Sequence, residues 1–149
     1  MVVITDLVDN IKDIHPQNKL DVANRLANWA LAKTYNKYDG AYKSPVFKNM
    51  EITKDKVNVY FDNAPTGLVI KGKKATDFYI AGEDQNFMPA DVKIEKDKIV
   101  LTNKTVKAPV AVRFGFSNTA MPNLFSKEGL PVTPFRTDNW DVLTIKSND

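Results

Sequence analysis

Apolar residues recur with helical spacing between residues 18 and 35. Val22, Leu26 and Trp29 follow one another at intervals of four and three positions, and alanine is frequent between them. This spacing places the three side chains on one face of an α-helix, and alanine has the highest helix propensity. The sequence therefore predicts an amphipathic helix. A lone helix of about five turns cannot bury such a face by itself, so we expect another element to cover it.

The segments on either side of this helix carry start and stop signals. Pro16 precedes the helix, and the fixed φ and missing N–H of proline are tolerated in a first turn. Turn residues follow it up to Gly40, which is suited to a left-handed terminal conformation. We place a domain boundary there. Nearer the start, residues 2–4 (Val-Val-Ile) predict a short buried strand, as in the interior of a longer protein.

Beyond residue 40 the apolar spacing changes to the period of two residues that is typical of β-strands. Residues 46–52 and 57–61 flank one polar turn, residues 92–95 and 99–101 flank a second, and both turns carry Lys-Asp-Lys. These segments predict two hairpins. Short strands with turn signals at intervals of about ten residues favour a β-sandwich. Further strands are predicted at residues 68–70, 78–81, 110–116 and 143–145.

Residues 117–140 combine prolines with large apolar side chains. Pro122, Pro131 and Pro134 are interspersed with residues such as Phe125. Proline at this density blocks regular strand pairing, while the apolar side chains still favour burial. We expect an ordered loop that lies on other structure.

Composition and charge exclude several classes of partner. The 149 residues, 43% of them apolar, suffice for one sizeable core and are few for two independent domains. The net charge is only +3, lysine alternates with aspartate and glutamate, and the three arginines lie far apart. Because a nucleic-acid surface needs clustered basic residues, no nucleic acid is expected as a partner. No stretch has the apolar length needed to cross a bilayer, so no membrane is expected either.

The chain contains no cysteine and one histidine. Disulfides, thiolate catalysis and cysteine-ligated zinc are therefore excluded, as is any site that needs two imidazoles. We expect neither a metal nor another cofactor. The absence of cysteine is compatible with either side of a bacterial inner membrane.

The single histidine lies in the sequence Asp13-Ile14-His15-Pro16. In an extended or turn conformation, a carboxylate two residues before an imidazole can approach it within hydrogen-bond distance. Such a carboxylate fixes the imidazole tautomer and stabilises the imidazolium that forms when the ring takes a proton. These residues alone leave two interpretations open. His15 is either a general base with its orienting acid, or a polar residue that caps the helix or lies on the surface beside an acidic one.

A series of motifs runs through nearly the whole chain. In chain order these are residues 5–19 around Asp13-Ile14-His15, Arg25-Leu26-Ala27, residues 29–35, Gly40, Ser44-Pro45-Val46, Phe78, residues 80–84, residues 109–113, Asn123-Leu124-Phe125, residues 128–131 and residues 134–138. In this order they resemble the last catalytic block of the sialate O-acetylesterases and the β region beyond that block. That family belongs to the SGNH-hydrolase superfamily.

The resemblance implies a division of the chain and a chemistry. Members of this family have an α/β/α hydrolase domain followed by β structure, and they remove acetyl groups from hydroxyls of sialic acid and related sugars. Residues 1–40 would then be the last loop and helix of the hydrolase domain, and residues 41–149 an accessory β-sandwich. The expected fold is mainly β with an N-terminal helix. A periplasmic or secreted location is implied where the full-length protein carries a signal peptide.

The resemblance also implies roles for particular residues. His15 would be the general base that activates a serine, and Asp13 the orienting carboxylate. The common superfamily spacing puts the acid three residues before the histidine, a position that Lys12 occupies here. Asp13, or alternatively Asp9, must therefore serve.

The serine nucleophile has no match in this chain. In the family it lies in a Gly-Asp/Gln-Ser-like segment near the start of the hydrolase domain, together with the residues of the oxyanion hole. The serines here are Ser44, Ser117, Ser126 and Ser147, and none has that sequence setting. The loss of one triad member and of the oxyanion donors leaves little acceleration. We therefore expect a C-terminal portion that acts only with the missing hydrolase segment on an O-acetylated sugar.

A second interpretation is a non-catalytic β-sandwich module that binds carbohydrate or protein. Aromatic side chains such as Tyr38, Tyr42, Phe87 and Trp140 could stack on sugar rings if they are exposed, although in a small sandwich aromatic residues are more often part of the core. Under the first interpretation, the isolated chain should hide the apolar face of the helix, either by self-association or by folding the helix back on the sandwich.

Overall fold

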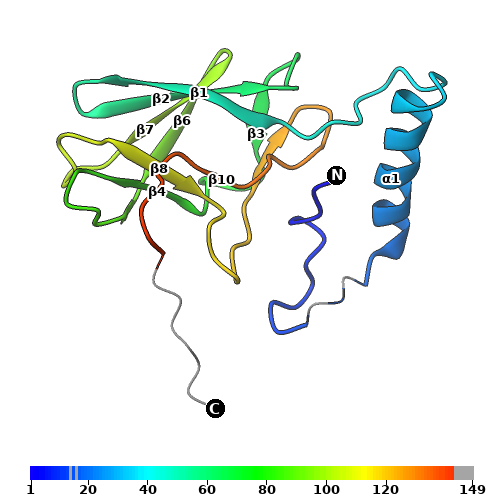
Figure 1. Cartoon of the computed structure of the whole chain (residues 1–149), viewed down its shortest axis with the longest axis horizontal. Helices are drawn as coiled ribbons and strands as arrows, with labels where there is room; N and C mark the ends of the chain where they lie inside the picture. Colours follow the sequence, from blue (N-terminus) through cyan, green and yellow to red (C-terminus); the bar gives the residue numbers. More distant parts are fainter. Residues whose placement is uncertain (14, 16, 143–149) are drawn as a thin grey trace.

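One helix and ten short strands make up the fold within residues 1–13, 15 and 17–142, which the computed structural model describes. The predicted mainly β architecture with an N-terminal helix is confirmed (Figure 1). The elements are α1 (Lys19–Lys33), β1 (Val46–Thr53), β2 (Lys56–Asp62), β3 (Leu68–Ile70), β4 (Phe78–Ala81), β5 (Met88–Pro89), β6 (Asp91–Glu95), β7 (Lys98–Thr102), β8 (Ala111–Phe114), β9 (Leu124–Ser126) and β10 (Phe135–Arg136).

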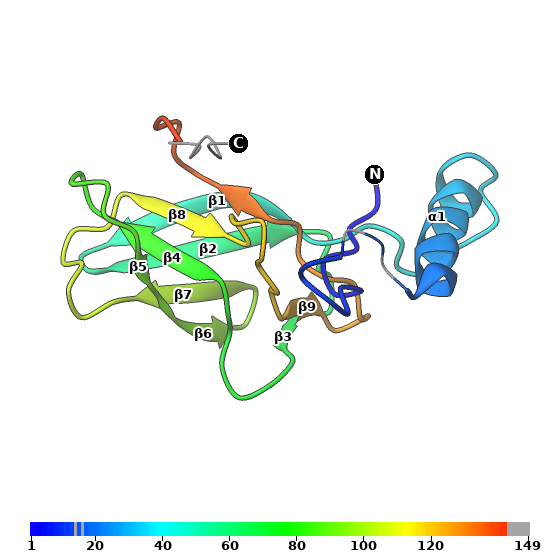
Figure 2. The same ribbon diagram turned by 90° about the horizontal axis from the view of Figure 1, so that it is seen from below.

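The strands form two four-stranded antiparallel sheets and one small two-stranded sheet. The first sheet has the order β1-β2-β7-β6, the second has the order β10-β8-β4-β5, and β3 pairs with β9. Both views show the helix standing apart from the strands, with the N-terminal segment between them (Figures 1 and 2). The β part therefore has the predicted sandwich character, and the helix is attached at one end of it.

The hydrophobic core is shared by all three sheets. Val57 and Val59 alternate along β2 and are fully buried, and Phe114 of β8 stacks on Phe78 of β4 with ring centroids 4.1 Å apart. Alternate side chains of a strand point to the same face, so β2, β4, β7 and β8 each contribute every second residue to the core. The buried cluster consists of Val57, Val59, Leu68, Phe78, Ile80, Ile99, Leu101, Val112, Phe114, Leu124 and Val132.

The two predicted hairpins are both present, and they share one turn geometry. Thr53 pairs with Lys56 across the first turn, and Glu95 pairs with Lys98 across the second. The first residue of each two-residue turn is a lysine with positive φ, 58° at Lys54 and 49° at Lys96. Non-glycine residues rarely adopt this conformation outside such turns. Shared turn chemistry therefore accounts for the similarity of the hairpins.

The proline-rich segment 117–140 is more regular than predicted. It lies on the rest of the molecule as expected, but it also contains β9, which pairs with β3, and β10, which pairs with β8. Buried Pro122 and Pro131 stand outside the residues of β9. Strand pairing therefore survives because the prolines flank the paired residues instead of interrupting them. The strand predicted at residues 143–145 lies outside the described residues.

The helix begins where predicted and ends slightly earlier. The side chain of Asn18 accepts a hydrogen bond from the backbone N–H of Asp21 at 3.1 Å, which caps the first turn. At the other end the left-handed residue is Asn36, with a φ of 52°, and the backbone N–H of Lys37 donates to the carbonyl of Leu31. The prediction that Gly40 takes this role is therefore wrong. Asparagine also tolerates the left-handed conformation, and the left-handed residue lies earlier in the chain, at Asn36. Pro16 lies outside the described residues.

The N-terminal segment is irregular. The strand predicted at residues 2–4 is wrong: no strand is assigned among residues 1–13, although Val3 and Leu7 are both buried. A strand needs a pairing partner for its backbone, and the described residues offer none to this segment. Within the described residues, no helix is long and apolar enough to cross a membrane.

Candidate functional site

The single histidine lies in a loop that its own polar groups hold in shape. The side chain of Asn10 accepts from the backbone N–H of Lys12 at 3.0 Å, and its carbonyl accepts from the N–H of Asp13 at 3.0 Å. The carboxylate of Asp9 accepts from the N–H of Gln17 at 3.2 Å, which closes the loop. Asp9, the alternative orienting acid, is therefore engaged in closing the loop.

Asp13 is the carboxylate that meets the imidazole. One oxygen, Oδ1, accepts the backbone N–H of His15 at 2.9 Å and lies 3.1 Å from the ring Nδ1. If Nδ1 donates to this carboxylate, the neutral ring presents Nε2 as a proton acceptor. The side chain of His15 is 77% exposed and that of Asp13 is 50% exposed. The pair therefore has the geometry of a base and its orienting acid, open to a partner that approaches from outside.

The pKa of Asp13 is lowered from its usual value. The largest cause is the hydrogen bond from the backbone N–H of His15, followed by the hydrogen bond to the His15 ring, with a smaller electrostatic contribution from Lys19. Both hydrogen bonds favour the ionised carboxylate. Asp13 is therefore an anion at neutral pH, as required of a group that stabilises an imidazolium.

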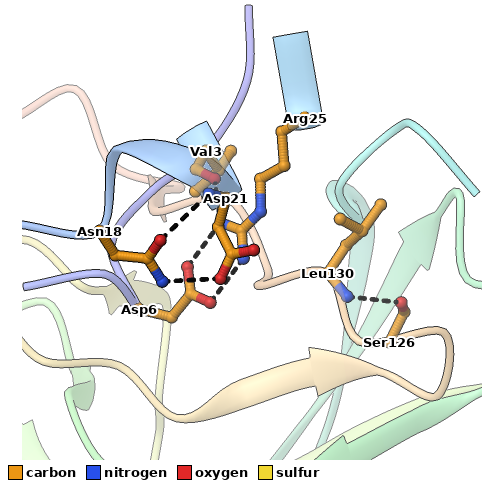
Figure 3. Close-up of polar contacts among 7 residues, drawn as sticks. All are labelled: Val3, Asp6, Asn18, Asp21, Arg25, Ser126 and Leu130. Atoms are coloured by element: carbon orange, nitrogen blue, oxygen red, sulfur yellow. Dashed lines mark hydrogen bonds and ion pairs between the residues drawn. The ribbon is translucent and has the colours of Figure 1, made fainter. Parts of the chain in front are cut away.

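A partly buried ion pair attaches this region to helix α1 (Figure 3). Both terminal nitrogens of Arg25 donate to the two carboxylate oxygens of Asp6 at 2.7 Å, and Nη1 also donates to the carbonyl of Val3 at 2.7 Å. The side chains are only 14% and 11% exposed. Asp6 raises the pKa of Arg25 through these hydrogen bonds. The histidine loop is thus bounded by a fixed N-terminal segment before it and a helix tied to that segment after it.

A cavity of about 350 Å³ lies beside the histidine loop. One side belongs to the N-terminal segment and the loop, including Asp13, and the other belongs to the connection between β8 and β9. The lining residues are Ile4, Thr5, Val8, Asp9, Ile11, Asp13, Asn118, Thr119 and Ala120. The sequence did not indicate that residues 118–120 reach the histidine loop, because a contact between distant loops leaves no local pattern.

The described serines lack the setting of an activated nucleophile. Ser126 is buried in β9, and its hydroxyl accepts from the backbone N–H of Leu130 at 3.3 Å (Figure 3). Ser44 uses its carbonyl to accept from the side chain of Asn63. Ser117 is exposed at the start of the β8–β9 connection. A nucleophile needs a base within hydrogen-bond reach, and none of these three hydroxyls hydrogen-bonds to His15. Ser147 lies outside the described residues.

Three of the four aromatic side chains considered for sugar stacking, those of Tyr42, Phe87 and Trp140, pack on other aromatic rings. Tyr42 meets Trp29 of the helix edge-on at 5.5 Å, and Phe87 meets Trp140 in the same way at 5.8 Å. The guanidinium of Arg113 lies over the Phe87 ring at 4.0 Å. These four rings are half-buried in such contacts. Among the described residues, no group of three or more acidic, cysteine or histidine side chains is placed to hold a metal ion.

Comparison with known proteins gives one informative result. No protein-family model matches the chain, and no curated protein does. The crystal structure of a novel carbohydrate acetylesterase from Xanthomonas citri is similar, with a TM-score of 0.85 and 41% sequence identity over 93% of this chain. The chain spans 32% of the length of that acetylesterase. The predicted esterase relationship is therefore confirmed at a coarser level: this chain is related in sequence and fold to part of a carbohydrate acetylesterase.

Proposed function

We propose that this chain is the C-terminal portion of a carbohydrate O-acetylesterase and supplies its general base, His15. The observation that carries the proposal is the contact between His15 and Asp13, found in a chain that is 41% identical to part of a carbohydrate acetylesterase. Asp13 orients the imidazole and, as an anion, stabilises the imidazolium when Nε2 takes the proton of a serine. The full motif series supports the narrower assignment to the sialate-type esterases of the SGNH-hydrolase superfamily.

The serine and the oxyanion donors come, in this proposal, from a hydrolase segment that precedes this chain. The exposure of His15 supports this, because a base that is 77% exposed has room for a nucleophile on a separate surface. The three described serines have other surroundings. On this basis the isolated chain hydrolyses acetyl esters very slowly, since positioning and oxyanion stabilisation are both absent.

The outer face of helix α1 is the surface that we assign to the hydrolase segment. Leu20, Ala23, Ala27 and Leu31 follow one another at helical spacing, and all four are exposed, Leu20 to 71%. Trp29, which the sequence places on the apolar face with Val22 and Leu26, packs edge-on against Tyr42 and is not part of this exposed stripe. Uncovered apolar stripes of this kind promote association. The isolated chain therefore self-associates through this face when the hydrolase segment is absent.

Acetyl release tests the proposal directly. The chain is assayed alone and joined to the segment encoded immediately upstream of Met1, with p-nitrophenyl acetate and an O-acetylated sugar as substrates. We expect turnover only in the joined protein. There, His15→Ala should lower kcat by at least about 10³-fold, the scale for removing the base of a triad. Asp13→Asn should lower kcat by at least about tenfold less than His15→Ala does in the same assay.

Two results would contradict the proposal in different ways. Turnover by the isolated chain that His15→Ala abolishes would show that the nucleophile lies within it. A joined protein that folds but releases no acetate would show that the chain does not serve an esterase. Lys12→Ala is a matched control in the same loop, because only the backbone of Lys12 takes part in the hydrogen bonds of the loop. It should leave kcat within about twofold of the parent.

A further inference from the structure

We propose that the cavity between the histidine loop and the β8–β9 connection binds the sugar unit of the substrate, and that it selects a neutral sugar. This inference rests on the proposed function, and it gives the β-sandwich a part in choosing the substrate. The cavity contains Asp13 in one wall and Asn118 and Thr119 in the other. A ligand held there lies beside the group that orients the base.

The size and lining of the cavity suit an acetylated sugar. Its volume of about 350 Å³ falls in the range of small-molecule sites. Ile4, Val8 and Ile11 give it an apolar side for the carbon skeleton and the acetyl methyl group. Asn118 and Thr119 line it as well, and their amide and hydroxyl groups can each donate and accept hydrogen bonds, as sugar hydroxyls do.

The polar groups of the cavity are available to a ligand. The side chains of Asn118 and Thr119 are exposed and hydrogen-bond to no other described residue. Neither side chain has to give up a hydrogen bond within the protein to bind a sugar hydroxyl, so the gain is not offset by a lost bond.

The loop that carries these residues is held firmly at both ends. Before it, the N–H of Gly115 donates to the carbonyl of Asp77 at 3.0 Å; after it, the N–H of Met121 donates to the carboxylate of Asp77 at 3.1 Å. The hydroxyl of Thr76 also donates to the carbonyl of Met121 at 3.0 Å. Anchors at both ends reduce the conformational freedom that ligand binding would otherwise have to remove. Asn118 and Thr119 are therefore presented to the cavity by a preorganised connection.

The charge of the lining decides between sugar classes. Asp9 and Asp13 both line the cavity, and among the described residues no lysine or arginine does. Lys19 lies close enough to Asp13 to influence it but is not part of the wall. A sugar carboxylate placed in this cavity would face two carboxylates without a compensating cation, whereas a neutral acetylated hexose meets no such repulsion. Within a family whose members act on sialic acid and related sugars, the site of this chain therefore favours a neutral acetylated sugar over O-acetylated sialic acid itself.

The binding test uses the isolated chain labelled with ¹⁵N. It is titrated with methyl 6-O-acetyl-glucopyranoside, which is neutral, and separately with O-acetylated N-acetylneuraminic acid, which is anionic. We expect amide shifts at Thr5, Asn118 and Thr119 with the neutral sugar and at least fivefold weaker binding of the anionic one. Asn118→Ala should raise Kd for the neutral sugar at least fivefold. Ser117→Ala, in the same loop but outside the lining, should leave it unchanged.

A charge variant sharpens the test. Asp9→Asn keeps an oxygen that can accept the N–H of Gln17 but removes one negative charge from the wall. It should improve binding of the anionic sugar relative to the neutral one by about threefold. Shifts confined to residues outside the cavity, equal or tighter binding of the anionic sugar, or no effect of Asn118→Ala would each overturn the inference.

The joined protein separates this inference from the proposed function. There, Asn118→Ala should raise KM for the neutral acetylated sugar at least fivefold, with a smaller change in kcat. Sugar binding at the cavity in a joined protein without esterase activity would refute the proposed function and leave the sugar site standing. Esterase activity in the joined protein, with a KM that Asn118→Ala leaves unchanged, would support the proposed function and refute the sugar site.

Discussion

The β-sandwich and the N-terminal region, residues 1–40, bury their apolar side chains to very different extents. Phe114, Ile80 and Leu101 in the sandwich are completely buried. Helix α1 has no buried residue, and its Leu20 and Leu26 are 71% and 53% exposed. Apolar burial is the main favourable contribution to folding. The sandwich therefore stabilises itself, while the helix depends on a few attachments.

This difference in burial bears on the proposed site. The His15–Asp13 pair belongs to the weakly packed region, yet the cavity beside it is completed by a loop of the well-packed region. A rigid scaffold that presents loops to a site is a common arrangement in enzymes. The sandwich can thus fix one wall of the site while the helix face remains available for another surface.

The largest expected effect comes from truncating the core of the sandwich. Phe114→Ala should lower the free energy of unfolding by about 3 to 5 kcal/mol, because it removes a fully buried ring that stacks on Phe78. At concentrations low enough to keep the chain monomeric, Leu31→Ala in the helix should cost less than about 1 kcal/mol, since Leu31 is already 37% exposed. Urea unfolding followed by circular dichroism compares the two. Similar losses would mean that the helix is buried in solution, for instance by folding back on the sandwich.

The contrast between the two regions also explains which features could be predicted. The hairpins were predictable because period-two apolar residues and a Lys-Asp-Lys turn are local signals. The sequence did not predict β10 because Pro134 precedes it directly, and proline disfavours strand pairing. In the structure β10 pairs with β8, and Pro134 lies just outside the paired residues.

The candidate site was predictable only in part, because only some of its residues are close together in the sequence. Asp13 and His15 are two positions apart, so a turn is enough to join them. The Asp6–Arg25 ion pair and the wall formed by residues 118–120 depend on how distant segments pack. Their residues carry no local pattern that marks them as neighbours. Tertiary packing therefore determined the part of the site that the sequence did not reveal.

A smaller effect is expected from breaking the attachment of the helix. Asp6→Asn removes the charge that balances Arg25 but keeps its size, and loss of one partner of a buried ion pair typically costs about 3 kcal/mol. This cost should remain confined to residues 1–40, because Asp6 and Arg25 both lie there. Amide hydrogen exchange should show faster exchange in α1 with unchanged protection in β2 and β7. Lys33→Gln, an exposed change at the end of the same helix, serves as the control.

Faster exchange throughout the sandwich of Asp6→Asn would contradict this division. It would mean that the two regions unfold as one unit, in spite of the uneven burial. Unchanged exchange in α1 would show instead that Val3, Leu7 and the Trp29–Tyr42 contact hold the helix without the ion pair.

The smallest effect concerns acid and belongs to the sandwich. Arg113 donates to both carboxylate oxygens of Asp138 at 2.9 and 2.7 Å, and these hydrogen bonds lower the pKa of Asp138 below its ordinary value of 3.8. A carboxyl group whose pKa is lower in the folded state stabilises that state above its unfolded pKa, and this contribution is lost as the pH falls through the folded value. The sandwich should therefore keep its stability between pH 7 and pH 5 and lose part of it below about pH 4.

Urea unfolding at successive pH values should show this fall in the parent and a flatter profile in Asp138→Asn, which has no charge to neutralise at that position. An equally steep fall in both proteins would assign the acid sensitivity to other carboxylates. It would also mean that the ion pair between Arg113 and Asp138 contributes little to stability, although the side chain of Asp138 is only 1% exposed.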